Sequence, residues 1–188
     1  MFWIRVRGRD TGEVLATAEL LKAAAVAEGK RAVASPVPMA WPAEAMCAIG
    51  TATSAAGGRV LMADGLIIQD PSVLGRPDIF ARLSQEAYVL VNAACGFGDL
   101  GISDRVERFC RDRTIILPAA RLDTGRHDGL IRSAAMLGGF AALSRVISLD
   151  GAVSALENVA PESARRACAE AAGAAYEFVR AERDALAA

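Results

Sequence analysis

The sequence predicts an α/β fold: a single Rossmann-like three-layer domain, spanning residues 1–188, with a mostly parallel sheet. Short apolar stretches typical of buried strands alternate along the chain with alanine- and leucine-rich stretches of helical spacing. One strand candidate, Leu66–Gln69, runs directly into Asp70-Pro71-Ser72. There an N-cap carboxylate and a proline at the first helical position turn the chain sharply out of the sheet. Because parallel strands need long crossovers, this alternation favours a sheet covered on both faces.

The expected elements follow from local signals such as β-branched runs, capping residues, and glycine or proline at element ends. Strands are expected at Phe2–Val6, Arg31–Ser35, Glu44–Ile49, Arg59–Met62, Leu66–Gln69, Tyr88–Asn92 and Thr114–Leu117. Helices are expected at Val14–Glu28, Ile79–Leu83 and Leu130–Ser144, from a cap at Ser103 to about Asp112, after a cap at Ser148, and from Pro161 onward. Three prolines exclude regular structure from the segment Ser35–Pro42, which is therefore expected to be a loop.

Composition limits the class of protein. The 188 residues carry a net charge of −1, so no nucleic-acid footprint is present. No apolar run is long enough to cross a bilayer, and the first residues lack the apolar core of a signal peptide, so a cytoplasmic location is expected. Hydrophobic residues make up 53% of the chain, and the mean hydropathy is +0.29. This excess reflects either an alanine-rich, GC-rich coding bias or a subunit that buries surface against partners.

The four cysteines are scattered, with no C-x-x-C pair among Cys47, Cys95, Cys110 and Cys168. Zinc and iron–sulfur sites need clustered thiolates, so we expect no metal site in this chain. Cys168 shares a helical spacing with Ala164, Ala171, Ala175 and Phe178, which predicts core packing.

The first candidate binding site is the turn Gly8–Glu13, which follows the first strand and opens the first helix. Unpaired N–H groups and the helix dipole favour an anion at such a position. The candidate contacts are Gly8, Arg9, Thr11 and Gly12. Asp10 and Glu13 would repel a phosphate. The turn is thus either an anion site or a purely structural connection.

Three other features have a simpler interpretation beside the functional one. Gly96–Gly101 has the spacing of a dinucleotide fingerprint, but the predicted helix starts only after it, which favours a surface loop. His127, the sole histidine, lies in a polar turn without an orienting partner, so a solvated side chain is expected and not a general base. Trp41, among prolines, either folds back on the core or anchors a neighbouring subunit.

From Phe2 to about Phe178 the sequence resembles the gamma subunit, or gamma domain, of 2-oxoacid:acceptor oxidoreductases of the pyruvate:ferredoxin type. The matching segments are Ile4–Gly8, Ala18–Leu21, Glu28–Lys30, Leu66–Leu74, Leu90–Asn92, Ala134–Phe140, Ser148–Leu149 and Tyr176–Glu177. In the family's glycine-rich first turn only Gly8 matches in register, with Arg9 as a frequent companion. The segment Ser35–Ala43 is shorter than in the family and rich in proline.

The resemblance implies a non-catalytic gamma subunit that contributes to assembly and to the coenzyme A site of a complex that oxidatively decarboxylates a 2-oxoacid to an acyl-CoA. It implies alpha, beta and delta-type subunits as partners. These would carry thiamine diphosphate with Mg²⁺ and 4Fe–4S clusters, with coenzyme A as co-substrate and no cofactor on this chain alone. The altered turn and loop point to a divergent branch, for which an aryl 2-oxoacid enzyme of the phenylglyoxylate type is one candidate. The alternative is a free-standing nucleotide-binding or assembly module.

Overall fold

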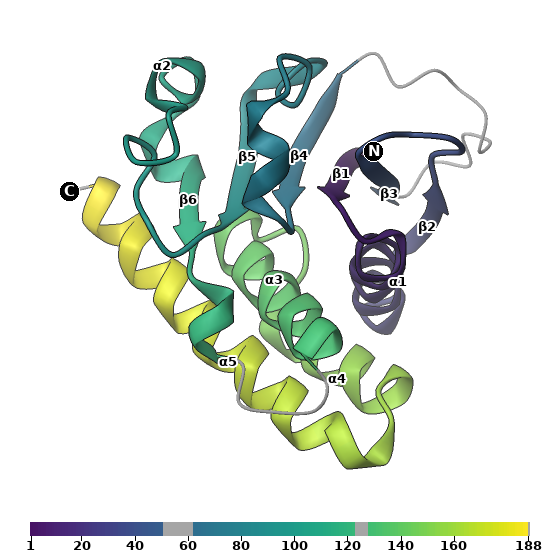
Figure 1. The fold of residues 1–188 in the computed structure, drawn as a ribbon. Coiled ribbons are helices and arrows are strands. Elements are labelled where there is room, and N and C mark those ends of the chain that lie inside the picture. Colours follow the sequence, from purple (N-terminus) through teal and green to yellow (C-terminus); the bar gives the residue numbers. More distant parts are fainter. Residues whose placement is uncertain (51–61, 123–127, 188) are drawn as a thin grey trace.

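The structure is a computed structural model that describes residues 1–50, 62–122 and 128–187 (Figure 1). Six strands form one sheet in the order β2-β3-β1-β4-β5-β6. Their bounds are β1 (Phe2–Gly8), β2 (Arg31–Pro36), β3 (Ala43–Gly50), β4 (Ala63–Ile68), β5 (Leu83–Asn92) and β6 (Thr114–Leu117). β1, β4, β5 and β6 pair in parallel, whereas β3 runs antiparallel to both β1 and β2. The predicted α/β fold with a mostly parallel sheet is confirmed.

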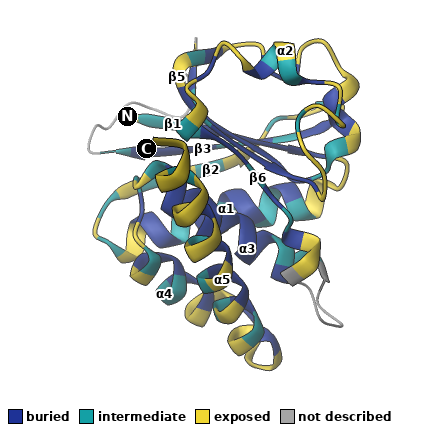
Figure 2. Cartoon of the chain, turned by 90° about the vertical axis from the view of Figure 1, so that its left-hand side faces the viewer, coloured by how far each residue is buried: buried dark blue, intermediate teal, exposed yellow. Residues whose placement is uncertain are grey.

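Four helices cover one face of the sheet: α1 (Thr11–Ala27), α3 (Asp128–Ser144), α4 (Leu149–Val159) and α5 (Glu162–Ala187). Figure 2 shows them beneath the sheet, with their buried sides turned toward it. In the part of the chain that the structure describes, the other face carries short segments, η1 (Pro71–Gly75), α2 (Ser103–Val106) and the turns beside them, while η2 (Arg111–Arg113) packs against α5. The two layers around the sheet are therefore unequal, because the crossovers on the second face are made of turns instead of long helices.

The core divides in the same way. Alternate residues of β1, such as Ile4 and Val6, pack against the helices in the larger cluster. Ile68 and Val89 belong to a second cluster beneath the short segments. Cys168 is fully buried in the larger cluster, as its helical spacing predicts, although Phe178 on the same helix stays 38% exposed.

Two predicted helices are wrong. Ile79–Leu83 forms turns closed by bonds such as Ala81 N to Asp78 O (3.0 Å), and Leu83 already begins β5. A helix cannot continue here because Arg82 adopts a left-handed φ of 57°. The second, expected from a cap at Ser103 to about Asp112, is only the four residues of α2, in which Ile102 takes the N-cap position.

Other boundaries shift by a few residues. β4 starts at Ala63, three residues before the expected strand. The strand expected at Arg59–Met62 lies outside the described residues except for Met62, which is a bend. α1 starts at Thr11, before the expected Val14, because the Asp10 carboxylate accepts the Glu13 N–H at 2.9 Å as an N-cap.

Three glycines let α3 lie unusually close to its neighbours. A Cβ at Gly138 would stand 2.1 Å from the carbonyl oxygen of Ala172 in α5. A Cβ at Gly139 would stand 2.8 Å from Leu117 Cδ2 of β6. On the strand side, a Cβ at Gly65 would meet Phe140 Cζ at 2.6 Å. The Gly138-Gly139-Phe140 motif therefore sets the packing of α3 on both α5 and the sheet.

Ion pairs attach the turn that contains Asp78, on the second face, to strands β1 and β3. Glu44 of β3 accepts Arg5 Nε at 2.9 Å and lies 3.2 Å from Arg7 Nε. Arg7 also donates to Asp78 Oδ2 at 3.2 Å. Burial by itself raises the pKa of Asp78, but the contacts with Arg7 and Arg76 outweigh it and hold that pKa below its ordinary value. This network holds the turn between η1 and β5 against β1.

A second, partly exposed link joins α1 to α4. Glu28 accepts the Ser148 N–H and pairs with Lys30, each at 2.5 Å. Burial opposes ionisation of Glu28, yet the hydrogen bonds from Lys30 and Ser148 outweigh it and lower the pKa of this carboxyl below its ordinary 4.5. Ser148 also caps α4, because its hydroxyl accepts the Gly151 N–H at 3.0 Å.

Candidate functional site

A cavity of about 500 Å³ opens at the carboxyl edge of the sheet. It lies beyond the ends of β1, β4 and β5 and is lined by Arg9, Asp10, Glu13, Trp41, Gln69, Asp70, Pro71, Asn92, Ala120 and Arg132. After β1 the chain builds β2 and β3 on one side and then returns to β4 on the other side. The cavity therefore sits where the direction of the strand order reverses, which is where α/β sheets bind ligands.

The structure brings together only part of the predicted anion turn. Arg9, Asp10 and Glu13 line the cavity, whereas Thr11 and Gly12 are exposed in the first turn of α1 and are not among its lining residues. Gly8 is buried at the end of β1, where a Cβ would stand 3.0 Å from both Gln69 Cβ and Val14 Cγ2. Its role in the described structure is the close approach of β1 to β4 and α1.

The two carboxylates of the turn are compensated internally. Asp10 caps α1, and Glu13 pairs with Arg132 of α3, the closest N···O distance being 2.5 Å. About a quarter of each side chain in that pair is exposed, so the ion pair is only partly screened by solvent. The repulsion expected from Asp10 and Glu13 toward an anion is therefore reduced by the helix terminus and by Arg132.

Two buried carboxamides form the floor of the cavity. Asn92, at the end of β5, donates through Nδ2 to the Gln69 carbonyl at 2.8 Å and accepts the Ala119 N–H at 3.2 Å through Oδ1. Gln69 follows β4 and is 3% exposed. Its Nε2 donates to Thr17 Oγ1 and, at 3.4 Å, to the Glu13 carbonyl. Its Oε1 is buried without a partner in the described structure.

Sequence reasoning missed this floor. The available signal is a carboxamide side chain directly after each of two apolar stretches, at Gln69 and Asn92. Parallel strands place their carboxyl ends side by side, so such residues are expected to meet.

The rim carries an exposed cation and an exposed aromatic side chain. The Arg9 side chain is 67% exposed, and its Nε lies 4.0 Å from Asp70 Oδ2. Asp70 is the predicted N-cap: its Oδ1 accepts the Ser72 N–H at 2.8 Å, although the helix that it opens is the single 3-10 turn η1. Trp41 is 70% exposed, so it does not fold back on the core.

The other candidates lie apart from this cavity or outside the described residues. Gly96–Gly101 closes a surface turn, in which Asp99 Oδ2 accepts the Gly96 N–H at 3.3 Å. It precedes the four-residue α2, not the long helix that a dinucleotide fingerprint opens. His127 lies outside the described residues.

Metal chemistry has no visible support in residues 1–50, 62–122 and 128–187, where no three His, Cys, Asp or Glu side chains are close enough to hold an ion. Burial raises the pKa of the Cys47 thiol to about 12 and also raises the pKa of Cys168, whereas Cys95 and Cys110 are exposed. None of the helices in the same described ranges combines the length and apolar character that a membrane span requires.

Comparison with known proteins gives one sequence relative and several similar structures. The chain is 28% identical over 184 residues to the pyruvate synthase subunit PorC of Methanothermobacter marburgensis, an alignment that covers 96% of this chain and 98% of the relative. No protein-family model matches the sequence.

Pyruvate oxidoreductase subunit PORC of Thermotoga maritima superposes with a TM-score of 0.72 at 22% identity, over 94% of this chain and 95% of that one. The gamma subunit of a keto/oxoacid ferredoxin oxidoreductase from Geobacter sulfurreducens gives 0.69 at 20% identity, over 96% and 99% of the two chains.

A 2-oxoglutarate:ferredoxin oxidoreductase from Magnetococcus marinus, solved with 2-oxoglutarate, coenzyme A and succinyl-CoA bound, gives a TM-score of 0.69 at 13% identity. This chain is covered to 98% and corresponds to 31% of that longer one. The near-complete sequence alignment and the superposition lead to one conclusion: the chain is similar in sequence to a pyruvate synthase subunit, and it shares its fold with the gamma subunits of 2-oxoacid:ferredoxin oxidoreductases.

Proposed function

We propose that residues 1–188 act as one gamma-type domain, a non-catalytic subunit of a cytoplasmic complex that oxidatively decarboxylates a 2-oxoacid to an acyl-CoA. The observation that carries this proposal is the alignment with a pyruvate synthase subunit along 96% of the chain. In this proposal the alpha, beta and delta-type partners hold the thiamine diphosphate, Mg²⁺ and 4Fe–4S clusters.

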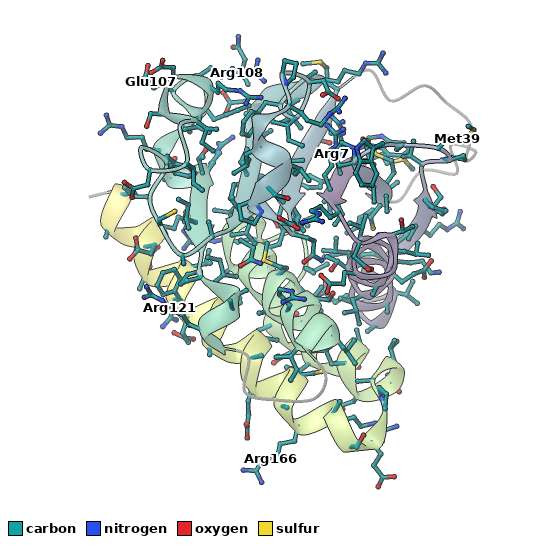
Figure 3. All side chains as sticks on the ribbon, in the orientation of Figure 1. Arg7, Met39, Glu107, Arg108, Arg121 and Arg166 are labelled. Carbon is teal, nitrogen blue, oxygen red and sulfur yellow. The ribbon has the colours of Figure 1, made fainter. Side chains whose placement is uncertain are left out.

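Exposed apolar side chains support a role in assembly. Met39 is fully exposed and Trp41 is 70% exposed, both on the loop between β2 and β3. In Figure 3 Met39 stands at the outer side of the molecule, whereas Arg7 lies inward beside β1. Val33 on the edge strand β2 is 51% exposed as well. Large apolar side chains that remain in water are costly in a monomer and are typical of subunit interfaces.

Purification of the affinity-tagged chain from its native cells tests the assembly. We expect larger iron-containing subunits to accompany it in fixed stoichiometry, with reduction of an acceptor that depends on coenzyme A and a 2-oxoacid. Phenylglyoxylate, pyruvate and 2-oxoglutarate are the substrates to compare. A chain that purifies alone as a stable monomer, or that binds NAD or FAD by itself, contradicts the proposal.

The coenzyme A role is assigned to the turn formed by Gly8, Arg9, Thr11 and Gly12. Arg9 supports this assignment, because its exposed guanidinium stands at the cavity rim and its nearest anion, Asp70, is 4.0 Å away. Internal compensation of Asp10 and Glu13 supports it too. In this proposal Gly8 and Gly12 serve mainly to keep the turn narrow, and Arg9 provides the charge that meets a phosphate.

Arg9→Ala in the assembled complex tests that contact. Loss of one exposed charged hydrogen bond costs about 1–2 kcal/mol, so the KM for coenzyme A is expected to rise by roughly fivefold or more. The KM for the 2-oxoacid should not change. Arg31→Ala is the matched control. Arg31 is also exposed, but it lies at the start of β2, opposite Gly50 in the strand register, and so at the other end of the sheet from the cavity. Equal KM values in the two variants would refute the contact.

A further inference from the structure

We propose that the cavity at the carboxyl edge receives the guanidinium group of an arginine side chain from a partner subunit. This inference rests on the proposed function for the source of that side chain. The cavity itself indicates the chemistry, because it combines a buried acceptor that has no partner among the described residues, an excess of carboxylates and an exposed aromatic ring.

The buried acceptor is Gln69 Oε1. The Glu13 carbonyl can only accept hydrogen bonds, so it fixes Nε2 of the Gln69 amide on the α1 side and leaves Oε1 without a partner among the described residues. An unsatisfied buried acceptor costs about 1–3 kcal/mol. Gln69 lines the cavity, so the occupant that we propose is one whose N–H groups approach this amide from the cavity side and can reach Oε1 with a small movement of the side chain.

The charge of the lining selects a cation. Asp10, Glu13 and Asp70 face two arginines, Arg9 and Arg132, and Glu13 is already paired with Arg132. Asp10 and Asp70 each use Oδ1 to cap a backbone N–H, so in the described structure Oδ2 of each remains for another donor. Asp70 Oδ2 is only loosely approached by Arg9, at 4.0 Å. Asp10 and Glu13 are compensated by the helix terminus and by Arg132, but an anion placed deep in the cavity would still meet repulsion from Asp70.

The aromatic ring favours guanidinium over ammonium. Trp41 lines the same cavity and is 70% exposed, so its indole face is accessible. A planar guanidinium stacks on such a face while its fork of N–H groups reaches a carboxylate and an amide oxygen together. An ammonium group has donors but cannot stack in this way. The cavity volume of about 500 Å³ leaves ample room for one arginine side chain.

This occupant is compatible with the proposed coenzyme A contact. A guanidinium that pairs with Asp70 takes the carboxylate that Arg9 approaches at 4.0 Å. Arg9 is then released toward the rim, where a phosphate would lie.

The test uses the full chain with N-acetyl-arginine methylamide as the probe and the uncharged N-acetyl-citrulline methylamide as its matched control. A Trp3→Phe background leaves Trp41 as the sole tryptophan, so indole fluorescence reports on the cavity. We expect saturable quenching by the arginine probe and none by the citrulline probe. Binding of coenzyme A or inorganic phosphate at the same reporter, without binding of the arginine probe, would overturn the inference.

Two variants locate the binding site. Asp70→Asn keeps an N-cap residue but removes the charge, so probe affinity should fall by about tenfold, as for loss of a charged hydrogen bond. Gln69→Met keeps an unbranched chain but removes the acceptor, and a similar loss is expected if the fold is retained. Trp41→Ala, followed by NMR because the fluorophore is lost, should weaken binding by about two- to fivefold. Asparagine can cap η1 as aspartate does, so unchanged affinity in Asp70→Asn refutes the site.

The assembled complex identifies the source of the guanidinium. There the arginine probe should no longer reach Trp41, because the partner side chain occupies the cavity. Free access of the probe in the complex would refute the partner as occupant. If the probe fails with a chain that still co-purifies with its partners, only this inference falls. If the probe binds but no partner co-purifies, the proposed function falls and the guanidinium chemistry of the cavity stands.

Discussion

Gly138→Ala tests the packing of α3 against α5. The added Cβ would stand 2.1 Å from the Ala172 carbonyl oxygen, whereas ordinary contact begins at 3.4 Å, so the helices must separate by roughly 1.3 Å there. The atoms of Ala172 that this Cβ would meet belong to the backbone of α5, so they cannot rotate away as a side chain could. Overpacking of this kind costs about 3 kcal/mol, and the better helix propensity of alanine returns about 1 kcal/mol. The net loss of about 2 kcal/mol corresponds to a fall in Tm of roughly 4–8 °C for a chain of this size.

Gly173→Ala in α5 is the matched control. It is the same substitution in a helix, but the added Cβ meets no described atom within 4 Å. The free energy of unfolding should rise by up to about 1 kcal/mol from helix propensity alone. Urea unfolding followed by circular dichroism measures both variants. If Gly138→Ala is as stable as Gly173→Ala, the close approach of α3 to α5 is not what the glycine provides, and the packing argument fails.

Three further predictions concern ionisable groups. Glu44→Gln should destabilise the fold by about 3 kcal/mol, because it removes the carboxylate partner of two buried arginines. Glu86→Gln is the control: the Glu86 side chain is 69% exposed, so its loss should cost less than about 1 kcal/mol in the same urea assay. Because the folded pKa of Glu28 is lower than its ordinary 4.5, its contribution is present above that pH and is lost as pH falls through the folded pKa. Wild type should therefore lose more stability than Glu28→Gln on acidification from about pH 6 to about pH 3, and parallel losses would contradict this. Cys47, whose pKa burial raises to about 12, should react with a thiol reagent only after unfolding; labelling at the rate of the exposed thiols would show that the core opens.

Local signals in the sequence predicted the parallel part of the sheet and the long helices. The strand β6 and the helix α3, which contains Gly138, are predicted from their own residues, because buried strands and amphipathic helices carry periodic patterns. The prediction was wrong for segments that lack such a pattern. Ile79–Leu83 is apolar enough for a helix, but its side chains fill the second core from turns, an outcome decided by contacts distant in sequence.

The candidate site was predicted only in part for the same reason. The turn after β1 could be located from Gly8 and the capping residue Asp10, since both act within a few residues. The salt bridge from Glu13 to Arg132 joins positions 119 residues apart, and no local pattern indicates it.

By itself, the sequence determined the α/β class, the resemblance to gamma subunits, and the position of the first turn, because these depend on periodicity and short-range capping. Only the tertiary structure decided that Gln69 and Asn92 form a common floor, that Gln69 Oε1 lacks a partner within residues 1–50, 62–122 and 128–187, and that Trp41 stays exposed at the rim. The physical reason is that strand order and side-chain burial are set by long-range packing. A cavity between strand ends exists only once those strands are side by side.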